Sequence, residues 1–150
     1  MLGNTAGTGT WQGEALEALL PHRPPMVLLD GARDLTADSC QGWLQVNPQA
    51  WYARPDGSMP AWFGLEVMAQ TIAVYSGATG LQKDEPVRIG YLLGTQAYTC
   101  AVDAFPAGTL LETRVDLDYQ DDSGLVAFRC ELQAQGSPVA ACVLKLFRQP

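Results

Sequence analysis

Basic residues are scarce in this sequence: nine lysines and arginines stand against sixteen aspartates and glutamates, giving a net charge of −7. A nucleic-acid-binding protein needs a basic surface to neutralise phosphates, so this balance argues against that class. It also argues against a polybasic membrane anchor. Residues 1–20 lack the basic and apolar segments of a secretory signal, which predicts a cytoplasmic protein.

Cysteine is also rare, and its spacing gives no sign of a metal site. No two of the four cysteines form a C-x-x-C pair, so we expect no metal and no cofactor. Cys130 and Cys142 are equidistant from Gly136 and could face each other across a hairpin. Because no secretory signal is present, we expect them to be reduced thiols in the core.

The longest apolar stretch spans residues 61–79 and raises the question of membrane insertion. Glu66 and Gln70 lie well inside this stretch, and small residues dilute it. A central acid costs a few kcal/mol in lipid, so a helix in a protein core is the better interpretation and no membrane insertion is expected.

The length fits a single domain over residues 1–150, with a flexible N-terminus over residues 1–12. A short helix is predicted over residues 13–20 and a long one from Pro60 to about Thr79, with the proline at the first helical position. Strands are predicted over residues 26–35, 40–47, 87–102, 109–119, 125–135 and 138–148. The order predicts an α+β fold in which a long antiparallel sheet covers one apolar helix.

Glu66 is the only charged residue of the segment "MPAWFGLEVMAQ". A buried carboxylate either finds a partner or raises its pKa and stays protonated. A protonated carboxyl group can act as a general acid. A structural acid, bonded to a backbone amide or reaching water, is the other interpretation.

Three strings occur in order: "LLPHRPPM", "PAW-G-E-MAQ" within residues 60–70, and "LLGT". Together they resemble the hot-dog-fold β-hydroxyacyl-ACP dehydratases, most closely the dehydratase-like branch associated with aryl-polyene pigment biosynthesis, over residues 19–148. The resemblance implies an antiparallel sheet wrapped around a central helix. It also implies a homodimer or dimer of dimers acting on acyl carrier protein or CoA thioesters in fatty-acid or polyene-type biosynthesis.

The resemblance assigns roles to individual residues. Glu66, six residues after Pro60, matches the catalytic acid of the family. Ala61 takes the place of a glycine whose backbone N–H helps to hold the thioester carbonyl, and Gln70 matches a family glutamine that supports the acid or bonds within the core. Trp62 and Phe63 are expected to line the acyl pocket or the dimer seam, with core packing as the alternative.

The usual catalytic histidine is missing, because "WYARPDGSMP" contains none. Tyr52 falls near its position, and Asp56 is either a second carboxylate or a turn residue. The single histidine, His22, bonds to backbone near a chain reversal, lines the acyl entrance, or has taken over the role of base, from its own or the facing subunit. Arg23 and Arg88 are either phosphopantetheine contacts or ordinary surface residues.

Three functions therefore stay open. The first is a dehydratase of β-hydroxyacyl thioesters, with Glu66 as the acid and His22 or water as the base. The second is an acyl thioesterase on the same fold, in which Glu66 activates water and no histidine is needed. The third is a catalytically degenerate subunit that binds acyl chains or pairs with an active homologue.

Overall fold

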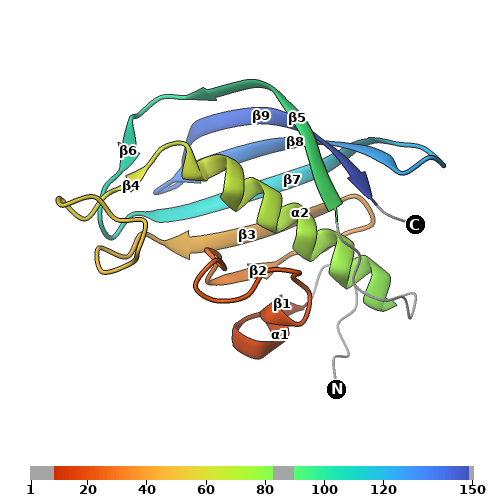
Figure 1. Ribbon diagram of the computed structural model, residues 1–150, viewed down its shortest axis with the longest axis horizontal. Coiled ribbons are helices and arrows are strands. Elements are labelled where there is room, and N and C mark those ends of the chain that lie inside the picture. Colours follow the sequence, from red (N-terminus) through yellow and green to blue (C-terminus); the bar gives the residue numbers. More distant parts are fainter. Residues whose placement is uncertain (1–8, 83–89, 149–150) are drawn as a thin grey trace.

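The computed structural model describes residues 9–82 and 90–148 of the chain. Seven strands form one antiparallel sheet in the order β1-β2-β3-β7-β8-β9-β5. They are β1 (Thr10–Trp11), β2 (Gly31–Arg33), β3 (Ser39–Gln45), β7 (Leu110–Gln120), β8 (Leu125–Ala134), β9 (Ser137–Arg148) and β5 (Gly90–Cys100). Helix α2 (Phe63–Gln82) lies across one face of this curved sheet (Figure 1). The predicted α+β arrangement is therefore confirmed.

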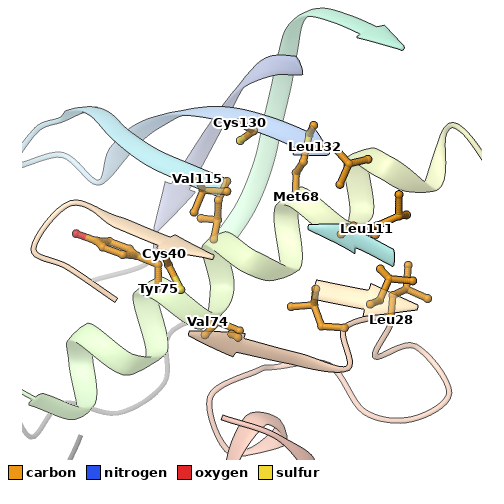
Figure 2. Packing of buried hydrophobic residues seen from close by; sticks show 14 of the residues in the cluster. Leu28, Cys40, Met68, Val74, Tyr75, Leu111, Val115, Cys130 and Leu132 are labelled. Atoms are coloured by element: carbon orange, nitrogen blue, oxygen red, sulfur yellow. The ribbon is translucent and has the colours of Figure 1, made fainter. Parts of the chain in front are cut away.

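The core lies between α2 and the sheet. Val67, Met68, Thr71 and Val74 on the helix are fully buried, because the helix is enclosed on more than one side. Figure 2 shows Met68, Val74 and Tyr75 projecting from the helix among side chains of the strands, including Cys40, Val115, Leu111 and Leu132. Within the described residues, no helix has the length and hydropathy needed to cross a membrane.

The predicted facing of Cys130 and Cys142 is confirmed. The two residues are direct partners in the β8–β9 register, and both side chains are buried. All four cysteines are free.

The N-terminal end of α2 differs from its prediction. Pro60 does not start the helix: Met59–Pro60 form β4, which pairs with β6 (Ala104–Phe105), and α2 begins at Phe63. The short β4–β6 ladder uses the backbone that a helix would need, which explains the later start. Glu66 consequently lies in the first helical turn and not two turns in.

Two further expectations were wrong. The strand predicted over residues 26–35 shrinks to Gly31–Arg33, because a side chain of α2 takes the backbone hydrogen bonds of Met26 and Leu28. The flexible N-terminus predicted over residues 1–12 includes β1, where Trp11 is buried and pairs with β2.

Residues 1–8 and Arg88 lie outside the described residues. The short helix predicted over residues 13–20 is α1 (Gly13–Glu17).

Candidate active site

Glu66 does not stand alone, because two polar side chains converge on one oxygen of its carboxylate. His22 Nε2 lies 3.2 Å from Glu66 Oε2, and Gln70 Nε2 donates a hydrogen bond of 2.8 Å to the same atom. His22 belongs to the loop between α1 and β2, and the other two residues belong to α2. The sequence left open whether a histidine of the facing subunit would be needed; here the contact forms within one chain.

Gln70 is the residue that brings the two segments together. Its side chain is completely buried, and its Oε1 accepts a hydrogen bond of 2.8 Å from the Leu28 N–H. Its Nε2 donates to the Met26 carbonyl at 2.7 Å as well as to Glu66. Glu66 and Gln70 share a helix face because they are four residues apart. The resemblance implied that Gln70 supports the acid or bonds within the core; its burial and its three bonds leave no surface for a substrate contact.

Arg23 fixes the loop that carries His22. Its Nη1 donates to the carbonyls of Glu17, Leu20 and His22 at 3.1, 3.0 and 2.6 Å. These bonds satisfy backbone carbonyls at the end of α1 and in the turn that follows it, which have no partner within the helix. The guanidinium therefore has a local structural function, which makes it a weaker candidate for a phosphate contact than the sequence indicated.

The charge state of Glu66 follows from these contacts. Burial by itself would raise the pKa of Glu66, but the hydrogen bonds from His22 and Gln70 and the charge of His22 outweigh burial and lower it below 4.5. The sequence left two possibilities for a buried Glu66: a partner for the carboxylate, or a raised pKa and a protonated carboxyl group. The two donors favour the first.

Four aromatic rings line the side of the site toward the start of α2. Phe63 lies 5.5 Å from Trp51, 5.9 Å from Tyr52 and 6.1 Å from Trp62, measured between ring centroids. Trp51 and Trp62 remain 52% and 61% exposed, so they present apolar surface to solvent around Phe63, the first residue of α2. Trp51 also donates from Nε1 to the Pro25 carbonyl at 2.8 Å, which connects the aromatic cluster to the His22 loop.

Sequence reasoning did not select Trp51 as a site residue. Its neighbour Tyr52 was selected as the nearest match to the missing histidine. The Tyr52 hydroxyl accepts a hydrogen bond from the Asn47 N–H at 2.9 Å, and burial raises its pKa. Only the aromatic pair in an otherwise polar loop could have drawn attention to Trp51, since its partners Phe63 and Pro25 are distant in sequence.

Two other candidates have structural partners. Ala61 cannot offer its N–H to a thioester, because that group donates to the Asp103 carbonyl at 2.9 Å. Among the described residues, the N–H groups of Trp62 and Phe63 have no acceptor. Asp56 accepts hydrogen bonds from the Ser58 N–H and hydroxyl, and the hydroxyl bond lowers its pKa, which is the pattern of a turn residue.

No group of three or more metal-ligating side chains (His, Cys, Asp or Glu) occurs within residues 9–82 and 90–148. His22 and Glu66 form a hydrogen-bonded carboxylate–imidazole pair, and the Gln70 amide lies beside it. Such a pair can take up and return a proton.

Comparison with solved structures gives the fold its name. The dehydratase heterocomplex ApeI:P from Xenorhabdus doucetiae superposes with a TM-score of 0.85 and 29% identity, covering 90% of this chain and 91% of that chain. A hypothetical thioesterase from Streptococcus pneumoniae, solved with coenzyme A, gives a TM-score of 0.61 and 10% identity, covering 79% of this chain and 84% of that chain. The TT0310 protein from Thermus thermophilus gives 0.60 and 16%, covering 79% and 90%. The last two share the fold alone, and the predicted hot-dog fold is confirmed.

No curated protein matches the sequence. The model of the ApeP-like family, described as ApeP dehydratase, matches residues 14–150. That match includes the His22 loop, the central helix and the strands of the second half. The chain therefore belongs to the ApeP-like dehydratase family, as the motifs around His22 and Glu66 predicted.

Proposed function

We propose that this protein dehydrates β-hydroxyacyl thioesters, with Glu66 as the residue that moves the proton. The observation that carries the proposal is the pair of contacts to Glu66 Oε2, from His22 at 3.2 Å and from Gln70 at 2.8 Å. They hold the carboxylate in one orientation. Within the described residues, Oε1 has no hydrogen-bond partner, so it is the atom that can meet a substrate.

The lowered pKa of Glu66 favours an ionised carboxylate, so the reaction begins with Glu66 as a base. Oε1 takes the proton from the carbon next to the thioester carbonyl, and the electron pair of that C–H bond forms an enolate. The enolate collapses to a carbon–carbon double bond, and the bond from the β-carbon to its hydroxyl group breaks. Glu66 returns the proton to the departing hydroxyl, which leaves as water.

This order changes the roles that the sequence suggested. Glu66 acts first as base and then as acid, so a separate histidine base is not required. His22 keeps a catalytic role as the group that shares a hydrogen bond with Oε2 and, when protonated, compensates the carboxylate charge. The imidazole is held by the loop that Gln70 and Arg23 fix, which supports a fixed geometry for the pair.

The thioester oxygen becomes negatively charged in the enolate and needs donors. The N–H groups of Trp62 and Phe63 stand at the start of α2, where the helix dipole also favours negative charge. They take the role that the resemblance gave to Ala61. Trp62 and Phe63 are also proposed to contact the acyl chain, together with Trp51 and Tyr52, because their rings form the apolar surface beside Glu66.

We propose that the thioester is carried by acyl carrier protein, with CoA as the other possible carrier, and that the reaction takes place in the cytoplasm. The similar structure from Xenorhabdus doucetiae is a dehydratase heterocomplex. By analogy, this chain would pair with a second dehydratase subunit, or with itself as a homodimer or dimer of dimers. The exposed side chains of Met26, Trp51 and Trp62 support such pairing, because large apolar groups on a surface favour being covered.

One assay tests this proposal against the two alternatives. The purified protein, alone and with a partner dehydratase subunit, is incubated with β-hydroxyacyl and plain acyl carrier-protein thioesters, and both are followed by mass spectrometry. Loss of water from the hydroxy substrate supports a dehydratase. Release of free acid supports a thioesterase. No change to either substrate by a folded protein supports an acyl-binding or partner subunit.

Substitution of Glu66 identifies the residue responsible. Glu66→Gln should lower the rate by about 100-fold or more, because an amide cannot accept the proton. Glu131→Gln is the matched control: Glu131 is an exposed carboxylate on β8 that bonds only Gln133 among the described residues, and its loss should leave the rate unchanged. A wild-type rate in Glu66→Gln would overturn the assignment. An unchanged rate in His22→Ala would remove His22 from the mechanism.

A further inference from the structure

A tyrosine side chain links the segment that leads into α2 to the large sheet by a hydrogen bond. Tyr98, on β5, donates a hydrogen bond of 2.7 Å from its hydroxyl to the Ala61 carbonyl. The same carbonyl accepts the Gly64 N–H at 2.9 Å, and the Ala61 N–H donates to the Asp103 carbonyl at 2.9 Å. Both polar backbone groups of Ala61 are therefore bound, and the first turn of α2 has a defined position relative to β5.

Gly64 provides the room that the Tyr98 hydroxyl occupies. A Cβ atom at position 64 would lie 2.5 Å from Tyr98 Oη and 3.3 Å from Leu132 Cδ2. The first distance is shorter than Cβ contacts in real proteins, so a larger residue would displace the hydroxyl. Burial raises the pKa of Tyr98, which keeps its hydroxyl protonated and able to donate.

We propose that Tyr98 is a positioning residue for Glu66, an inference that rests on the function proposed above. Glu66 lies two residues after Gly64, in the first turn of the helix. Its carboxylate meets Gln70 and His22. The contact with His22 joins the first turn of α2 to a loop that Gln70 binds one turn further along the helix, so its length depends on where this first turn sits. The bond from Tyr98 is a side-chain tie between that turn and the sheet.

The hydrogen bond from Tyr98 to Ala61 can be removed without changing the aromatic ring. Tyr98→Phe deletes only the hydroxyl. Tyr75→Phe is the control. Tyr75 lies in the core, in the second half of α2, and its hydroxyl also donates to a backbone carbonyl, that of Ala37. Both variants lose one hydrogen bond of the same kind, so both should lower the melting temperature by a similar amount.

Only Tyr98→Phe should affect Glu66. Carboxyl NMR should show the Glu66 titration midpoint rising toward the ordinary value of a glutamate in Tyr98→Phe, because the two donors then lie less well placed for the carboxylate. In Tyr75→Phe the midpoint should stay at the wild-type value. In the dehydration assay, Tyr98→Phe should lower kcat by about 10- to 100-fold with little change in KM, because a small misplacement of a reacting group costs this much.

The two readouts separate the possible failures. An equal Glu66 midpoint in the wild type and Tyr98→Phe would overturn the role of Tyr98, whatever the rates. If the wild type does not turn over substrate, the proposed function fails, and the NMR titration still decides the positioning role. If Tyr98→Phe does not fold, Gly64→Ala replaces it: the added methyl displaces the hydroxyl, and the same rise in the Glu66 midpoint is expected. An unchanged midpoint there overturns the inference as well.

Discussion

Replacing Gln70 by methionine would test whether this one side chain holds the His22 loop against α2. Methionine has nearly the same length and volume as glutamine but cannot make its three hydrogen bonds. The substitution therefore leaves the core filled while removing the bonds to Leu28, Met26 and Glu66. Any loss of stability then reports on hydrogen bonding and not on a cavity.

The size of the effect follows from the burial of each partner. The Leu28 N–H lies in a residue that is 7% exposed, and an unsatisfied buried donor costs about 1–3 kcal/mol. Met26 is 51% exposed and the Glu66 side chain 39% exposed, so water can replace Gln70 there, at a cost of about 0.5 kcal/mol each. The free energy of unfolding should fall by about 2–4 kcal/mol. For a domain of this size that corresponds to a drop in Tm of roughly 4–16 °C.

Urea and thermal unfolding, followed by circular dichroism, would measure the change. Gln45→Met is the matched control, because Gln45 is an exposed glutamine on β3 whose side chain bonds one backbone carbonyl, that of Gly108. It should change stability by no more than about 0.5 kcal/mol. If Gln70→Met cost as little as this control, Gln70 would not be the residue that holds the loop, and the argument for the shape of the site would be refuted.

Two further predictions concern the site and its support. Because folding lowers the pKa of Glu66 below 4.5, the ionised carboxylate adds to the free energy of unfolding. This contribution is complete at pH values above 4.5 and is lost as the pH falls through the pKa of the folded state. His22→Ala removes one of its partners, so the loss of unfolding free energy between about pH 7 and pH 3 should be smaller in this variant; equal losses would contradict the role of His22. Gly77→Ala should destabilise the protein by about 1–3 kcal/mol in urea unfolding, because the added Cβ would collide with the Leu19 carbonyl oxygen, a backbone atom that cannot rotate away. Ser76→Ala, on the same turn, should be nearly neutral, and a neutral Gly77→Ala would show that the loop after α1 adjusts freely.

The sequence predicted the fold well because its signals are local. The apolar run after Pro60 is too uniform for a surface helix, and the second half shows strand patterns separated by turn residues. The positions of Cys130 and Cys142 about Gly136 even predicted the register of a hairpin. These features depend on residues close in sequence, so patterns within a short window are sufficient to recognise them.

The site was predicted less completely because its contacts are long-range. The lone acid in the helix and the single histidine both attracted attention, yet nothing in either segment says that they meet. The direction of the Glu66 pKa shift stayed open for the same reason, since its sign depends on donors supplied by folding. The helix start was also misjudged, because Pro60 pairs with Ala104 in a ladder that the local pattern does not reveal.

The sequence by itself determined that a carboxylate and an amide share one face of a buried helix, because Glu66 and Gln70 are four residues apart. Only the tertiary structure decided what that face contacts. Gln70 takes the backbone bonds of Met26 and Leu28, the loop that follows α1 is held against α2, and His22 arrives at Glu66. The physical reason is that a buried polar group must find a partner, and which partner it finds depends on how distant segments pack.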